Sequence, residues 1–114
     1  MRRAFVEDPE VRVVLDANGV SDAQVVAMEH GIMRGAGKTI PGTGGLRKIR
    51  CGAEGRGKSG GVRVIFADYP GAGVTFLLAA FGKKEKSDLT GEERNSLRQI
   101  KRILDRQMAL GGER

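Results

Sequence analysis

The side chains best suited to chemistry are three cations on two neighbouring segments, namely Lys48, Arg50 and Arg63. Residues 46–51 alternate apolar with basic side chains and residues 62–69 are rich in β-branched residues, so both segments are predicted to be strands. If these strands pair, Lys48 and Arg50 lie on one face, and Arg63 can share that face with Arg50, depending on the register. Because like charges repel, such a cluster indicates an anion that bridges the cations.

Two ordinary explanations compete with a binding role for these cations. They could form a solvated face of the sheet, or they could pair with carboxylates such as Asp68 and Glu85. A further basic block, at residues 82–89, lies where the last predicted strand leads into the last predicted helix. A charge run of this kind either contacts the same anion or serves only as a solubilising turn. Its lysines are Lys83, Lys84 and Lys86.

A glycine-rich segment separates the two cationic strands. Residues 52–59 match the phosphate-loop pattern G-x-x-x-x-G-K-[ST] letter for letter. That pattern binds nucleotide phosphates only where the loop opens a helix, whereas here Gly60, Gly61 and a β-branched run follow. We therefore interpret the segment as a hairpin loop that presents Arg56 and Lys58, with glycines that let the backbone approach a phosphodiester.

Several other kinds of site lack the residues they would need. The chain has one histidine, His30, and one cysteine, Cys51. A disulfide framework, a His/Cys metal site and a Cys–His nucleophile pair are therefore not expected. We interpret His30 as a surface or packing residue near a helix end and Cys51 as a packed strand residue. Tyr69 could either cap a strand or stack on a base.

The distribution of charge favours an anionic partner. The 114 residues carry a net charge of +6 and give a pI near 10.0. Residues 1–45 contain five basic and six acidic side chains, residues 46–70 six and two, and residues 71–114 nine and six. The positive excess thus lies in the second half, where a polyanion would be attracted. No apolar run reaches the roughly 18 residues of a membrane span, and no signal-peptide core follows the N-terminus, so we expect a cytoplasmic protein.

Hydrophobic periodicity predicts helices at both ends of the chain. Capping-box patterns begin at Ser21 and at Thr90, and each precedes apolar residues at helical spacing. The first 40 residues are predicted to be mainly helical, and the last helix is followed by a frayed tail. Helices are expected at 9–17 and 21–34 within residues 1–40 and at 90–108 near the end of the chain. The tail is expected at 109–114.

The middle of the chain, residues 46–82, is predicted to consist of antiparallel strands. The strands expected at 46–51, 62–69 and 74–81 are joined by short connections, which favour a meander. The sequence therefore predicts one α+β domain over residues 1–114, a small twisted antiparallel sheet packed against N-terminal helices and a C-terminal helix. We expect the helices to cover one face and the other face to stay open, with basic side chains pointing outward.

Three basic blocks, taken together, resemble the RelE/ParE superfamily of bacterial toxin–antitoxin toxins, and specifically its HigB-like branch. The blocks are IPGTGGLRKIR (40–50), GRGKSGGVRVI (55–65) and GKKEKSDL (82–89), and their order and spacing fit over residues 40–105. The first 40 residues match only loosely. The resemblance implies a RelE-like fold and an endoribonuclease that cuts messenger RNA in the ribosomal decoding site, with no metal and no organic cofactor. It also implies a cognate antitoxin, expected to be a small helix-turn-helix protein, that covers the basic face.

The implied reaction needs a base, a stabiliser of negative charge and an acid, because the RNA 2′-hydroxyl attacks its own 3′-phosphate. Lys48 and Arg50 match the position on the first sheet strand where the family has its base. Crowding by Arg47, Arg50 and Arg63 would favour a neutral amine on Lys48. Arg63 matches the family's arginine in its Gly-x-Arg strand, which would hold the phosphorane oxygens.

The resemblance also suggests roles for residues around this group. Lys84 matches a basic residue after the last strand, which would assist the phosphate or the leaving group. Where some members of the family have a tyrosine, this chain has Thr90, which we interpret as a helix cap, so the leaving-group acid is unassigned. The residues expected to position RNA or the ribosome are Arg47, Arg56, Lys58, Lys83 and Lys86.

Two other functions are compatible with the same sequence. The fold also occurs in toxins that inhibit DNA gyrase, and fold alone does not fix function. A plain nucleic-acid-binding module is the third possibility. The aromatic content of 4% and the absence of tryptophan argue against a sheet that stacks bases, as many single-strand binders do.

Overall fold

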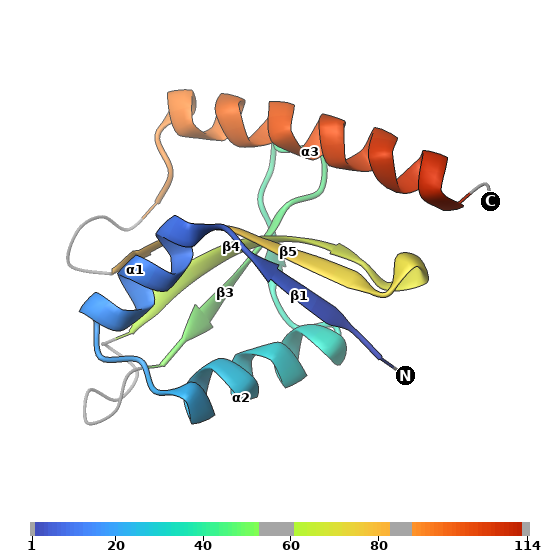
Figure 1. Cartoon of the computed structure of the whole chain (residues 1–114). Helices are drawn as coiled ribbons and strands as arrows, with labels where there is room; N and C mark the ends of the chain where they lie inside the picture. The colour runs from blue at the N-terminus through green and yellow to red at the C-terminus, as the bar shows by residue number, and fades with distance from the viewer. Residues whose placement is uncertain (1, 53–60, 83–87, 113–114) are drawn as a thin grey trace.

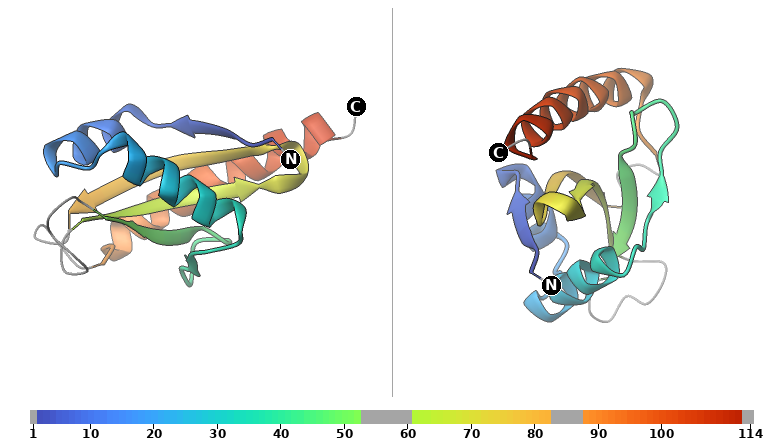
Figure 2. Two further views of the ribbon diagram at one scale, coloured as in Figure 1. Left: turned by 90° about the horizontal axis from the view of Figure 1, so that it is seen from below. Right: turned by 90° about the vertical axis from the view of Figure 1, so that its right-hand side faces the viewer.

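A computed structural model describes residues 2–52, 61–82 and 88–112. These residues form a five-stranded sheet with two helices on one face and a long helix on the other (Figures 1 and 2). The predicted α+β class is confirmed. The elements are β1 (Ala4–Glu7), α1 (Pro9–Ala17), α2 (Asp22–Met33), β2 (Lys38–Thr39), β3 (Arg47–Cys51), β4 (Val62–Tyr69), a 3-10 turn (Pro70–Ala72), β5 (Val74–Gly82) and α3 (Gly91–Gly112).

The sheet is mixed, with the order β1-β5-β4-β3-β2. Strands β3, β4 and β5 form the predicted antiparallel meander. The prediction of a wholly antiparallel sheet is wrong, because β1 pairs in parallel with β5, with Ala4 opposite Val74. The two shortest strands, β1 and β2, lie within the region predicted to be mainly helical. A strand of four residues, such as β1, or of two residues, such as β2, is too short to show a hydrophobic period in the sequence. Both strands are defined by their hydrogen bonds to the neighbouring strands.

The two N-terminal helices begin at the caps that the sequence indicates. Asp8 accepts a hydrogen bond from the Glu10 N–H, at 2.9 Å. Ser21 and Gln24 form a complete capping box: the Gln24 N–H donates to the Ser21 hydroxyl, and the Ser21 N–H donates to the Gln24 side chain. Both helices then pack on one face of the sheet, where α1 contributes Val11 and Leu15 to a core that also contains residues of α2, β3, β4 and β5.

The C-terminal helix differs from the prediction in length and in position. Its capping box is present, with hydrogen bonds between Thr90 and Glu93 in both directions. However, α3 has 22 residues and reaches Gly112, so residues 109–112 are helical rather than part of a frayed tail. Within the described residues, no helix is both long and apolar enough to cross a lipid bilayer.

The second face of the sheet is not open as predicted. Helix α3 lies across this face (Figure 2). Its Leu97 packs with Ile65 and Phe81 of the sheet in a second buried cluster. The reason lies in β4, whose side chains point alternately to the two faces of the sheet. Buried apolar residues occur in both of these sets. Such a strand needs cover on both faces, and the apolar stripe of α3 provides it.

Candidate functional site

Four cations from three adjacent strands line one open pocket with a volume of about 390 Å³. They are Lys38 of β2, Lys48 and Arg50 of β3, and Arg63 of β4. The register explains the grouping, because Arg50 lies opposite Arg63 and Lys38 lies opposite Lys48. The structure therefore brings together three of the four predicted catalytic residues and adds Lys38, which the sequence analysis missed.

Two glycines allow the strands to approach each other at this pocket. Gly61 has a φ of +102°, and a Cβ there would lie 2.5 Å from the Cys51 carbonyl oxygen, so only glycine fits where β4 begins beside β3. Gly37 has a φ of +111°, and a Cβ there would lie 2.9 Å from the Phe66 ring and 3.2 Å from the Lys48 carbonyl oxygen. Glycine at position 37 therefore lets the chain leading into β2 pass close to β3.

The element after the glycine-rich segment is the antiparallel strand β4. A phosphate loop needs a helix at that place, so the context that the pattern at residues 52–59 requires is not met by the described element that follows, and residues 53–60 themselves lie outside the described residues. The pocket thus takes its charge from strand side chains rather than from helix-terminal amides.

Among the described residues, Asp88 is a carboxylate within electrostatic reach of the pocket. Asp88 accepts a hydrogen bond from the Leu89 N–H, at 2.8 Å. This bond lowers the pKa of Asp88, and the positive charges of Lys48, Arg94 and Arg63 lower it further. The Asp88 side chain is 58% exposed, so it remains an ionised group at the margin of the cationic pocket.

Arg47 points to the opposite face of β3 from Lys48 and Arg50. Its guanidinium donates a 2.6 Å hydrogen bond to the Ala36 carbonyl, lies 3.6 Å from Asp68, and sits 4.9 Å from the centroid of the Phe66 ring. Asp68 also forms a 2.7 Å ion pair with Arg3. Of the two carboxylates considered as partners for the strand cations, Asp68 pairs with Arg47 and Arg3, and Glu85 lies outside the described residues.

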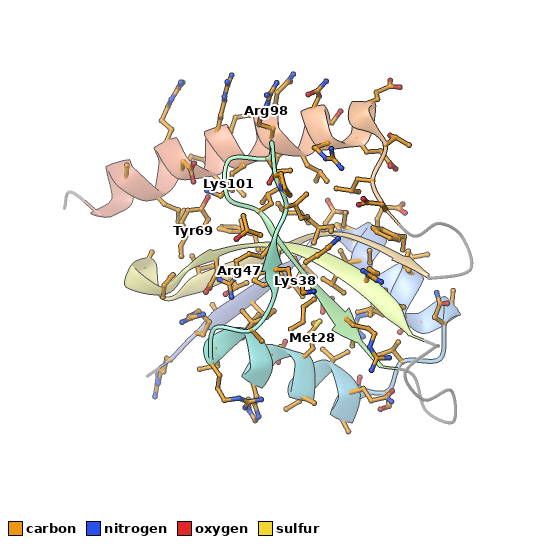
Figure 3. The ribbon with its side chains drawn as sticks, turned by 180° about the vertical axis from the view of Figure 1, so that it is seen from behind. Met28, Lys38, Arg47, Tyr69, Arg98 and Lys101 are labelled. Carbon is orange, nitrogen blue, oxygen red and sulfur yellow. The ribbon has the colours of Figure 1, made fainter. Side chains whose placement is uncertain are left out.

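A basic face of α3 also has internal contacts. Lys101 bonds to Asp105, lies 5.3 Å from the Tyr69 ring centroid, and packs near Gly44 and Gly45 (Figure 3). The Tyr69 hydroxyl donates a 2.7 Å hydrogen bond to Asp105. Tyr69 therefore joins the sheet to α3.

The remaining candidates have simpler positions. Cys51 is buried, and burial raises the pKa of its thiol. His30 is exposed in the last turn of α2. Thr90 is the cap of α3. Among the described residues, no group of three His, Cys, Asp or Glu side chains could hold a metal ion. Five predicted site residues lie outside the described residues: Arg56, Lys58, Lys83, Lys84 and Lys86.

A larger pocket of about 470 Å³ lies between β5 and the beginning of α3. Its charged lining residues are Glu92 and Glu93, which would repel a polyanion. The cationic pocket is therefore the better site for a phosphate-containing ligand.

Comparison with known families agrees with this fold. Residues 12–110 match the model of the RelE toxin of the RelE/RelB toxin–antitoxin system. Because the match covers most of the chain, the protein belongs to the RelE toxin family and is the toxin of a toxin–antitoxin pair. Its partner in such a pair is a cognate antitoxin.

Proposed function

We propose that this toxin is a metal-independent endoribonuclease that cuts messenger RNA on the ribosome. The observation that carries the proposal is the convergence of Lys48, Arg50 and Arg63 on one open pocket. A bent ribose-phosphate gathers negative charge as it reacts, and positioned cations stabilise that charge in the transition state. The narrower HigB-like relationship stays a prediction.

In the proposed reaction, Lys48 is the base that takes the proton from the ribose 2′-hydroxyl. The 2′-oxygen forms a bond to the adjacent phosphorus, and the bond from phosphorus to the 5′-oxygen breaks. The products are a 2′,3′-cyclic phosphate and a 5′-hydroxyl. Arg50 and Arg63, which face each other across β3 and β4, hold the non-bridging oxygens of the phosphorane.

The leaving 5′-oxygen needs a proton, and two nearby groups are unsuited to supply it. Asp88 has a lowered pKa and is therefore ionised at neutral pH. Thr90 caps α3 by accepting the Glu93 N–H, and it lines the pocket between β5 and α3 rather than the cationic pocket. We therefore assign assistance of the leaving group to Lys84, whose family position follows the last strand.

Binding partners follow from the same charge distribution. Ribosomal RNA and the messenger present phosphates that suit Lys38 and the basic residues at Arg56, Lys58, Lys83 and Lys86. The antitoxin, expected to be a small helix-turn-helix protein, would cover this basic region. We leave Arg47 out of the RNA-binding set, because its guanidinium is engaged on the other face of β3.

The test is Arg63→Ala, with Arg106→Ala as a control on the exposed side of α3. We expect Arg63→Ala to lower transcript cleavage at least about 100-fold, because it removes a stabiliser of transition-state charge. Primer extension on messenger RNA after induction measures cutting, and circular dichroism confirms folding. A folded Arg63→Ala protein that cuts like the wild type would refute the assignment.

A gyrase supercoiling assay with the same proteins tests the alternative function. Growth arrest by the wild type without new RNA ends, together with loss of supercoiling, would favour gyrase inhibition.

A further inference from the structure

A second pocket, of about 310 Å³, lies beside the cationic pocket between β3 and α2. The two pockets share Ile49 and Arg50, so they form adjoining parts of one surface. The second pocket has a different character, because Arg50 is the one charged residue that lines it among the residues that the structure describes. Its other lining residues are Gln24, Ala27, Met28, Cys51 and Gly52.

The amide of Gln24 has a fixed orientation. The Ser21 N–H donates to one end of this amide at 3.0 Å, and a backbone N–H can only donate, so that end must be the oxygen Oε1. The Nε2 group is thereby directed away from the cap, and it lies 3.9 Å from the position of a Cβ on Gly52, at the pocket. The capping box therefore holds an amide donor at the pocket.

The surface beside this donor suits a flat ring. Met28 lies on the side of α2 that faces β3 (Figure 3) and is only 4% exposed, so a small part of its polarisable thioether side chain forms the floor of the pocket, where it can contact an aromatic ring. Ala27 is exposed and small, which leaves room above it. Ile49 packs toward Gly31 and completes an apolar wall.

We infer that this second pocket binds the base of a nucleotide next to the scissile phosphate, and that Gln24 selects which base is accepted. The inference rests on the proposed function, because it needs an RNA whose phosphate lies in the cationic pocket. Arg50, shared by both pockets, contacts the phosphate and the rim of the base. The Nε2 donor favours a base that presents an acceptor edge, such as guanine or uracil.

The sharpest variant is Gln24→Glu. Glutamate is also a capping-box residue, so its carboxylate keeps the hydrogen bond from the Ser21 N–H while the amide donor becomes an acceptor. The probes are RNA trinucleotides with a single 2′-deoxyribose at the scissile position, which prevents cleavage, and with each base varied in turn. We expect the wild type to prefer guanine or uracil at one flanking position by roughly three- to tenfold, the usual effect of one hydrogen bond. Gln24→Glu should shift that preference away from uracil and toward adenine or cytosine, whose amino groups donate, whereas guanine presents both acceptors and donors and is the less informative probe.

Two further variants separate this effect from unspecific ones. Gln107→Glu makes the same chemical change on the exposed side of α3 and should leave base preference unchanged. Ala27→Leu places a larger side chain over the pocket from an exposed position and should weaken all trinucleotides, with loss of base preference.

The second readout is the base composition at cut sites in total RNA. A Gln24→Glu protein that cuts RNA with the wild-type base profile overturns the base-pocket inference and leaves the nuclease intact. If the wild type neither cuts RNA nor binds any trinucleotide, the proposed function itself fails and this inference fails with it. An altered profile at one position, with cutting retained, supports both.

Discussion

Neighbouring cations on β3 have opposite environments. Lys48 and Arg50 face an open pocket with Arg63, whereas Arg47 is 22% exposed and bonds to Ala36, Asp68 and the Phe66 ring on the other face. The four residues have the same charge, and three of them lie within one short strand. The difference arises from the two-residue period of the strand, which sends alternate side chains to different surroundings.

The contacts of Arg47 mark it as a structural cation. A cation with a partner carboxylate, a carbonyl acceptor and a ring face has its interactions met inside the fold. Cations gathered on one pocket repel each other and gain from an anionic ligand. The internal partners of Arg47 also hold β3 against the segment that leads into β2, and so they help to form the pocket.

The largest expected effect comes from removing one cation from each of the two environments, Lys48 from the pocket and Arg47 from the other face of β3. Lys48→Ala should lower RNA cleavage by about 100- to 10,000-fold, the usual contribution of a general base, and leave the free energy of unfolding nearly unchanged. Arg47→Ala should reduce the free energy of unfolding by about 2–3 kcal/mol, because it removes a charged hydrogen bond and a cation–π contact. Urea unfolding and a transcript-cleavage assay measure the two quantities.

Each variant serves as the control for the other. The assignment of a structural role to Arg47 and a catalytic role to Lys48 is contradicted if folded Arg47→Ala loses cleavage as severely as Lys48→Ala while keeping its stability. The assignment is also contradicted if Lys48→Ala is the less stable of the two variants.

The parts of this arrangement that depend on local pattern could be predicted. The alternation of residues 46–51 placed Lys48 and Arg50 together, and the capping boxes at Ser21 and Thr90 marked where α2 and α3 begin. These signals lie within a few residues of the feature that they indicate. They are therefore present in the sequence before any tertiary contact forms.

The parts that depend on register or on long-range packing could not be predicted. Lys38 reaches the pocket because a two-residue strand pairs with Lys48, and nothing in its own segment indicates that pairing. Asp88 gains its role from the fold, which brings it near Lys48 and Arg63. The placement of α3 on the second face was missed because an apolar stripe shows that a helix packs, but not against which surface.

Tyr69 is a structural contact between the sheet and α3, and its variant should have an effect of intermediate size on stability. Tyr69→Phe should reduce the free energy of unfolding by about 1 kcal/mol, because the hydrogen bond to Asp105 is lost. Cleavage should be unaffected, since Tyr69 lies away from the pocket lining. A large loss of cleavage with unchanged stability would give Tyr69 a role in the reaction instead.

The pH dependence of stability tests the same contact. Burial raises the pKa of Tyr69, and the hydrogen bond and negative charge of Asp105 raise it further. A raised pKa means that the folded state keeps its proton where the unfolded state loses it, so the stabilisation is complete below about pH 10 and is lost at higher pH. Because Tyr69 is the only tyrosine and the chain has no tryptophan, absorbance near 295 nm reports its ionisation directly. Native protein in which Tyr69 ionises at the pH of free tyrosine would contradict the contact between Tyr69 and Asp105.

Asp68 and Asp88 also differ in environment, one with an internal partner and one beside the pocket, but their charge is negative. The Asp88 variant below has the smallest expected effect. Asp68 is 8% exposed and paired with Arg3, whereas Asp88 is exposed beside the cationic pocket and opposes an incoming phosphate. Asp88→Asn keeps an acceptor for the Leu89 N–H and removes the negative charge, so affinity for an uncleavable RNA should rise about two- to fivefold at low salt.

The gain in affinity should fade as salt is added, because the interactions between Asp88 and its charged neighbours are exposed to solvent. It should also persist well into the acid range, since the pKa of Asp88 is lowered, and disappear only when the wild-type carboxylate takes up a proton. Weaker binding by Asp88→Asn would instead mean that this carboxylate contacts the RNA directly.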